Sequence, residues 1–124
     1  MILTELKHTC KSIDHNLNNT IIQAVANAYE VDIVDIMGVG REIPLPEARK
    51  MNYYIHYRCG YHLTAIAEKY GTSRDSIYRA LSDIPDYMRI YKEVKQKHNQ
   101  IINTILNKIN HEIETNANQI KRHA

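Results

Sequence analysis

Residues 63–82 constrain the fold of this chain most, because their pattern specifies two short helices joined by a tight turn. Ala67 is small at the point where a second helix has to cross the first closely. Gly71 can adopt the left-handed conformation that ends the first helix and turns the chain. Thr72 or Ser73 can then cap the N-terminus of the second helix. The pattern therefore predicts a helix-turn-helix.

The second helix of this unit has two distinct faces. Ile77, Ala80 and Leu81 recur at helical spacing and are expected to face a core. The outer face carries hydroxyl, carboxylate and guanidinium groups, which can read base edges in the major groove of DNA. Helix-turn-helix units also occur as plain packing elements, so a merely solvated face is the alternative. The candidate DNA-binding residues on this helix are Ser73, Arg74, Asp75, Ser76, Tyr78 and Arg79.

The rest of the chain is also helical in pattern. Apolar residues spaced three and four apart predict an amphipathic helix within residues 1–19. Asn18-Asn19-Thr20 is expected to break that helix and to cap a second one, which carries the apolar residues from Ile21 to Tyr29. We therefore predict an all-α fold, a helix-turn-helix bundle of about five to six helices with a long C-terminal amphipathic helix.

One clear loop, residues 38–46, follows a short helical turn over residues 32–37. Pro46 suits the first turn of the next helix, and Gly60 is expected to terminate that helix. The helix-turn-helix comes next and is expected to end near Asp83-Ile84-Pro85. These patterns divide the chain into an N-terminal helix (1–19), a helix-turn-helix domain (20–85) and a long C-terminal helix (86–124).

The C-terminal helix carries a long apolar stripe. Its steps of three and four residues average about 3.7, which is typical of a nearly straight helix and not of a left-handed coiled coil. The stripe can pack on the first helix of its own chain, on a symmetry mate, or on both. We expect a homodimer, the usual working unit of helix-turn-helix proteins, with a monomeric bundle as the alternative. The stripe comprises Tyr91, Val94, His98, Ile102, Ile105, Ile109 and Ile113.

Charge is unevenly distributed along the chain. Residues 1–40 hold two lysines and five acids, a net charge of 2 − 5 = −3. Residues 41–92 hold nine Lys or Arg and six acids, a net charge of 9 − 6 = +3. Phosphate binding needs positive charge on the half that carries the motif, although solvated surfaces often show the same balance.

Several short motifs between residues 21 and 84 occur in a characteristic order: Ile22-x-x-Val25-Ala26-x-x-Tyr29, Val31-x-x-x-Asp35-Ile36-Met37-Gly38, Ala48-Arg49-Lys50-Met51, Leu63-x-x-Ile66-Ala67 and Ser73-Arg74-Asp75. This order resembles the C-terminal DNA-binding domain of the bacterial replication initiator DnaA, within the Trp-repressor-like helix-turn-helix group. The resemblance implies double-stranded DNA as the partner. It also implies that Arg41, Arg49 and Lys50 contact phosphates or the neighbouring minor groove, and that Arg74 enters the major groove. Thr64 is a further candidate phosphate contact.

Catalysis and metal binding find less support in the sequence. His56-x-x-Cys59-x-x-His62 spaces three potential zinc ligands regularly, but a closed structural site needs a fourth, and no paired motif supplies one. A buried thiol flanked by imidazoles is the favoured interpretation. No nucleophile has a partnered base, so we expect no enzyme activity, no catalytic residue and no cofactor.

Two cysteines far apart in sequence, without a signal peptide or a run of about 20 apolar residues, indicate a protein of the reducing cytoplasm and not of a membrane. The expected function is sequence-specific DNA binding, as a dimeric transcriptional regulator. The alternative is a helical protein–protein interaction module, a replication or regulatory accessory, in which the helix-turn-helix is only a scaffold.

Overall fold

The computed structural model describes the backbone of residues 16–123 and the side chains of residues 16–115. Over this range the chain forms six helices and no strand, which confirms the predicted all-α class. Most of the helix predicted for residues 1–19 lies outside the described residues. The helices are α2 (Leu17–Tyr29), α3 (Ile33–Met37), α4 (Leu45–Arg58), α5 (Leu63–Tyr70), α6 (Arg74–Ile90) and α7 (Lys92–His123).

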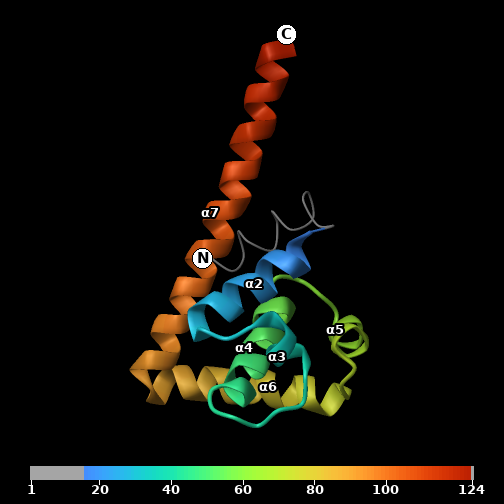
Figure 1. Cartoon of the computed structure of the whole chain (residues 1–124), viewed down its shortest axis with the longest axis vertical. Helices are drawn as coiled ribbons and strands as arrows, with labels where there is room; N and C mark the ends of the chain where they lie inside the picture. Colours follow the sequence, from blue (N-terminus) through green and yellow to red (C-terminus); the bar gives the residue numbers. More distant parts are fainter. Residues whose placement is uncertain (1–15, 124) are drawn as a thin grey trace.

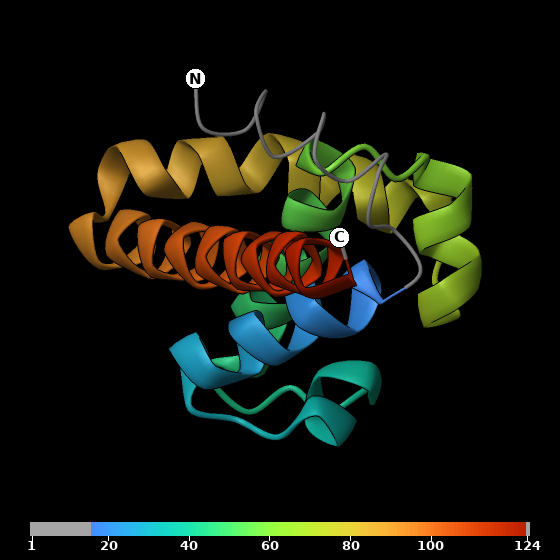
Figure 2. The same cartoon turned by 90° about the horizontal axis from the view of Figure 1, so that it is seen from above.

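Helix α4 is the centre of the bundle and contacts α2, α3, α5 and α6 (Figure 1). Its Ala48, Met51 and Ile55 side chains are fully buried. Seen along α7, the α3 helix and the α5 helix lie on different sides of the bundle (Figure 2). Six consecutive residues of α4, Met51 to His56, are buried, so the other helices pack around most of its circumference.

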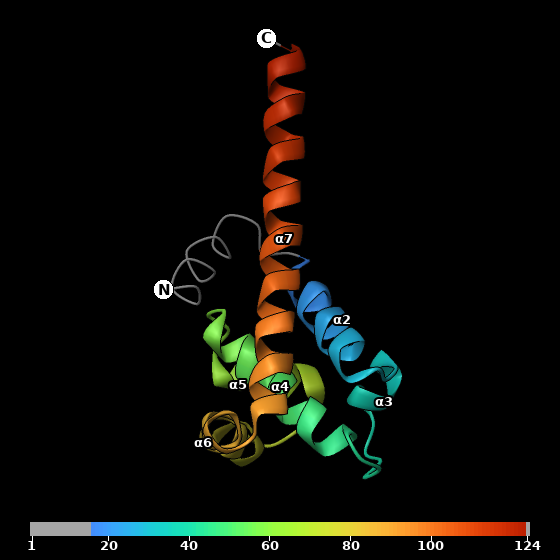
Figure 3. The same cartoon turned by 90° about the vertical axis from the view of Figure 1, so that its left-hand side faces the viewer.

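Helix α7 packs on α2 and α6 of its own chain and then projects beyond the bundle (Figures 1 and 3). Four stripe residues, from Val94 to Ile109, are buried in the main core, as is Ile101 beside them. The two ends of the stripe are open, with Tyr91 53% and Ile113 45% exposed. Most of the predicted stripe is thus covered within the subunit, chiefly by α2. The predicted helix 1–19, named as its possible partner, lies largely outside the described residues.

The expected helix break at Asn18-Asn19-Thr20 is wrong. These residues lie inside α2, which begins at Leu17, and the Thr20 hydroxyl donates back to the Asn16 carbonyl at 3.3 Å. Leu17 and Ile21 are buried on the same face of the helix. Their packing outweighs the modest helix penalty of the two asparagines, because intrinsic propensity is a weak term beside tertiary burial.

The expected helix end near Pro85 is also wrong, because α6 continues through this proline to Ile90. A proline inside a helix removes one backbone hydrogen bond. Ile84 is fully buried, and Tyr87 and Met88 pack against the main core, so burial on both sides of Pro85 keeps the helix continuous. The chain leaves the helix at Tyr91, whose backbone is extended, before α7 begins.

Candidate functional site

The turn between α5 and α6 forms at Gly71, as the sequence predicts. Gly71 has a φ of 62°, in the left-handed region. Its N–H donates to the Glu68 carbonyl at 3.3 Å, and the N–H of Thr72 donates to the Ala67 carbonyl at 3.0 Å. These two bonds satisfy carbonyls at the helix end that have no partner within the helix. The close of α5 is therefore determined by local backbone chemistry.

Ser73, and not Thr72, caps α6. The Ser73 hydroxyl oxygen accepts a hydrogen bond from the Ser76 N–H at 3.1 Å, and the two hydroxyl oxygens are also 3.1 Å apart. This contact satisfies one of the free N–H groups of the first turn. Ser73 and Ser76 are thus engaged with each other at the start of the helix.

A second apolar cluster fixes α5 and α6 to the bundle. It joins Tyr53 of α4, Ile66 and Ala67 of α5, and Ile77 and Ala80 of α6. Ile77 and Ala80 have no exposed surface, as expected from their helical spacing. Because these side chains are packed from two neighbouring helices, the opposite face of α6 is held in a fixed orientation.

That opposite face is exposed over the first two turns of α6. Arg74, Asp75, Tyr78 and Arg79 all lie on the surface, with Tyr78 56% exposed, while Ser76 is half-buried. Neither Arg74 nor Arg79 forms an ion pair with any residue that the structure describes. Two guanidinium groups, a phenol and a carboxylate are thus available to an incoming partner.

Arg49 lies half-buried behind the loop that precedes α4. Its Nε donates to the Ile36 carbonyl at 2.9 Å, its Nη2 donates to the Asp35 carbonyl at 2.7 Å, and its Nη1 donates to the Gly40 carbonyl. Two of these acceptors lie in α3, near its C-terminal end, where helix carbonyls lack partners. Arg49 therefore braces α3 and the loop, whereas Arg41, in the same loop, is exposed.

Lys50 links α4 to α6. Its Nζ donates to the Asp83 carboxylate at 2.6 Å and to the Tyr87 hydroxyl at 3.3 Å. The bond to Asp83 raises the pKa of the Lys50 amine, against the opposing effect of burial. Thr64, the remaining candidate phosphate contact, is half-buried in the first turn of α5. Of the four candidate phosphate contacts, Arg41 is the exposed one.

The regularly spaced His56, Cys59 and His62 do not converge. His56 is buried, with Nδ1 2.8 Å from the Asn52 carbonyl and Nε2 3.0 Å from the Tyr70 hydroxyl. His62 is exposed, and its Nδ1 caps α5. Among the described residues, no three His, Cys, Asp or Glu side chains gather as a metal site would require. Burial lowers the pKa of His56 to about 4, so its ring is neutral at pH 7.

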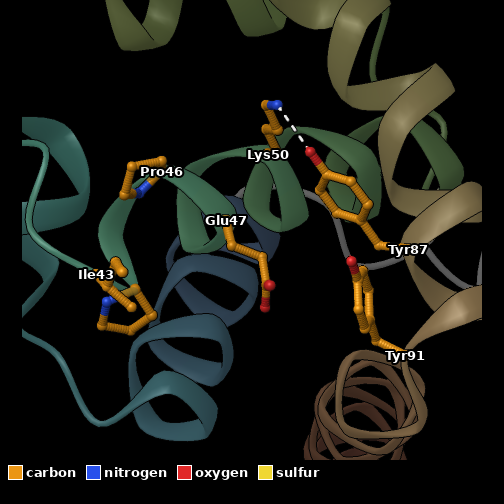
Figure 4. A pocket seen from close by; sticks show the side chains of 7 residues that line it. Ile43, Pro46, Glu47, Lys50, Tyr87 and Tyr91 are labelled. Atoms are coloured by element: carbon orange, nitrogen blue, oxygen red, sulfur yellow. Dashed lines mark hydrogen bonds between the residues drawn. The ribbon is translucent and has the colours of Figure 1, made fainter.

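A cavity of about 390 Å³ lies between the loop before α4 and the corner where α6 meets α7 (Figure 4). No sequence motif indicates it, because its walls come from segments about 40 residues apart. Apolar groups form most of its surface, with one acid, one amine and two phenols among them. The lining residues are Ile43, Pro44, Pro46, Glu47, Lys50, Tyr87 and Tyr91.

Comparison with known proteins adds no relative, since neither a family model nor a curated protein matches this chain. Within residues 16–123, no helix combines the length and the apolar character needed to cross a membrane. What the chain does is therefore inferred from its own geometry.

Proposed function

We propose that this chain binds double-stranded DNA in a sequence-specific manner through α5 and α6, as a homodimeric transcriptional regulator of the cytoplasm and not as an enzyme. Arg74, Asp75, Tyr78 and Arg79 would face base edges in the major groove. Arg41 would contact the phosphate backbone from the neighbouring loop. The resemblance of residues 21–84 to the DnaA C-terminal domain favours the same function.

The exposed start of α6 is the observation that carries this proposal. Two arginines without ion-pair partners among the described residues stand on a helix whose other face is packed against α4 and α5. A base-reading helix needs this combination, because side chains must be free while the backbone that aims them stays rigid. Residues 63–82 carry three basic and two acidic side chains, a net charge of 3 − 2 = +1.

Selection of bound duplexes from a random pool tests the proposal. Arg74→Ala and Arg79→Ala should each weaken binding to the selected site by about 1–3 kcal/mol, roughly fivefold to 150-fold, and relax the preference at one base position. Binding should also weaken steeply as salt rises, because phosphate contacts release counterions.

Arg89→Ala is the matched control. Arg89 lies in the last turn of the same helix, is exposed, and pairs with Asp86 at 2.9 Å. Its removal should change DNA affinity by less than about twofold, because Arg89 lies at the opposite end of α6 from the residues assigned to base edges, and loss of its exposed ion pair should affect stability little. If both Arg74→Ala and Arg79→Ala bind the selected site as tightly as the wild-type protein, the assignment of α6 to the major groove is wrong.

A second candidate function is a protein–protein interaction module, which the projecting end of α7 favours. Beyond the buried Ile109, the helix leaves the bundle with Ile113 partly exposed (Figure 1). This end would serve a second copy of the chain or a different partner. A gel-shift against random duplex DNA at low salt separates the candidates, because no shift at micromolar protein would favour the interaction module.

A further inference from the structure

The cavity beside the α6–α7 corner has the composition of a cation site. Tyr87 and Tyr91 form one wall, with ring centroids 6.3 Å apart and ring planes at 62°. In Figure 4 both rings lie on one side of the Glu47 side chain, and Ile43 lies on its other side. Aromatic faces carry negative electrostatic potential and attract cations, above all beside a carboxylate.

The cavity lining carries one acid, Glu47, and one amine, Lys50, and the local net charge becomes negative when Asp83, which pairs with Lys50 from outside the lining, is included. Lys50 is neutralised by Asp83, whose carboxylate oxygen lies 2.6 Å from the amine. Glu47 forms no ion pair with any residue in the described part of the chain. One uncompensated negative charge therefore remains at the cavity.

The polar group beside Glu47 is the buried phenol of Tyr29. Its hydroxyl lies close enough to the carboxylate to donate to it, although the contact falls outside ordinary hydrogen-bond geometry. Burial, and then the neighbouring Glu47, raise the pKa of the Tyr29 phenol, which keeps it neutral. The opposite wall of the cavity is apolar, with Ile43 94% exposed and Pro46 beside it.

We propose that this cavity binds a primary alkyl ammonium ion, either a free amine or the side chain of a lysine. The ammonium group would lie against Glu47 and the face of Tyr91, since the Lys50 amine already lies 5.5 Å from the centroid of the Tyr87 ring. The alkyl chain would lie against Ile43 and Pro46. This site does not depend on DNA binding, because Glu47 and both tyrosines lie outside the residues assigned to DNA.

Binding of matched five-carbon probes to the full chain, followed by NMR of the ¹⁵N-labelled protein, tests the proposal. Pentylammonium should bind saturably and shift resonances around Glu47 and Tyr91, whereas pentanoate and 1-pentanol should bind at least about tenfold more weakly. Equal binding of 1-pentanol would overturn the proposal, because it would show that only the apolar wall matters. Absence of saturable pentylammonium binding would overturn it as well.

Two pairs of variants identify the groups responsible. Glu47→Gln should weaken pentylammonium binding at least about tenfold, and Glu68→Gln, an exposed acid on α5, should leave it unchanged. Tyr91→Phe keeps the ring and should keep binding, while Tyr91→Ala should weaken it several-fold. Unchanged binding in both Glu47→Gln and Tyr91→Ala would overturn the assignment even if pentylammonium binds elsewhere.

The source of the ammonium group is distinguished in the same experiment. A blocked Gly-Lys-Gly tripeptide that binds more tightly than pentylammonium would identify a lysine side chain of a protein as the natural occupant. Tighter binding of pentylammonium would identify a free amine. If pentylammonium fails to bind while the gel-shift with DNA succeeds, this proposal falls and the proposed function stands.

Discussion

The buried ring of His56 should make the stability of this protein sensitive to mild acid. Its neutral form satisfies both ring nitrogens, because Nδ1–H can donate to the Asn52 carbonyl while Nε2 accepts from the Tyr70 hydroxyl. Burial lowers the pKa of His56 from 6.5 to about 4. Between these two pH values the unfolded chain binds a proton that the folded protein does not, so the free energy of unfolding decreases as the pH falls.

The size of this loss follows from the two pKa values. The free energy of unfolding should fall by about 2 kcal/mol between pH 7 and pH 5, and by about 3 kcal/mol by pH 4. That is a large share of the 5–15 kcal/mol of a typical domain. Burial also lowers the pKa of His98, which therefore adds a loss of the same sign.

Urea denaturation followed by helical circular dichroism at pH 7, 6, 5 and 4 measures the effect. His56→Gln removes the titrating group, so the stability difference between the wild-type protein and this variant should shrink by about 3 kcal/mol from pH 7 to pH 4. His98→Gln is the control, since this variant should retain the part of the pH dependence of stability that His56 causes. Parallel pH profiles for the wild-type protein and His56→Gln would refute the reasoning.

Two further predictions concern the loop before α4 and the turn after α5. Arg49→Ala should lower the free energy of unfolding by about 2 kcal/mol, because it removes three hydrogen bonds made by one guanidinium group. Arg41→Ala should change the free energy of unfolding by less than about 0.5 kcal/mol. It should also reduce the slope of log DNA affinity against log salt concentration by about 1. Chemical denaturation measures the stability and DNA titration measures the salt slope. A larger stability loss in Arg41→Ala than in Arg49→Ala, or a larger change of slope in Arg49→Ala than in Arg41→Ala, would contradict these roles. Gly71→Ala should lower the free energy of unfolding by about 1–2 kcal/mol. The positive φ alone causes this loss, because an added Cβ meets nothing within 4 Å. Gly71→Asn should lower the free energy of unfolding less, because asparagine tolerates a positive φ better. Equal thermal stability of Gly71→Ala and the wild-type protein would show that the turn is not strained.

Local chemistry made the turn between α5 and α6 predictable. The turn at Gly71, a cap at the start of α6 and the burial of Ile77 and Ala80 all depend on groups within a few residues of one another. Hydrogen bonds of four-residue range and side-chain spacings of three and four can be read directly from the sequence. The all-α class and the position of the motif follow from the same local rules.

Two helix boundaries were mispredicted because local and tertiary terms compete there. Asn18 and Asn19 favour a cap in isolation, and Pro85 favours a helix end. Burial of Leu17 and Ile21 in one case, and of Ile84 in the other, holds the backbone helical. The sequence carries no measure of that burial, since the covering surfaces come from other helices.

The amino-acid sequence by itself determined the helical class of this protein and the two-faced character of α6. Only the tertiary structure decided which cationic side chains are free to contact a partner. Arg49 donates hydrogen bonds to carbonyls up to 14 residues away, and Lys50 donates to groups 33 and 37 residues away. It also decided that most of the α7 stripe is covered within the subunit, and it assembled the cavity around Glu47 and Tyr91. The physical reason is that helical hydrogen bonds join near neighbours, whereas the partners of a side chain are chosen by packing between segments distant in the chain.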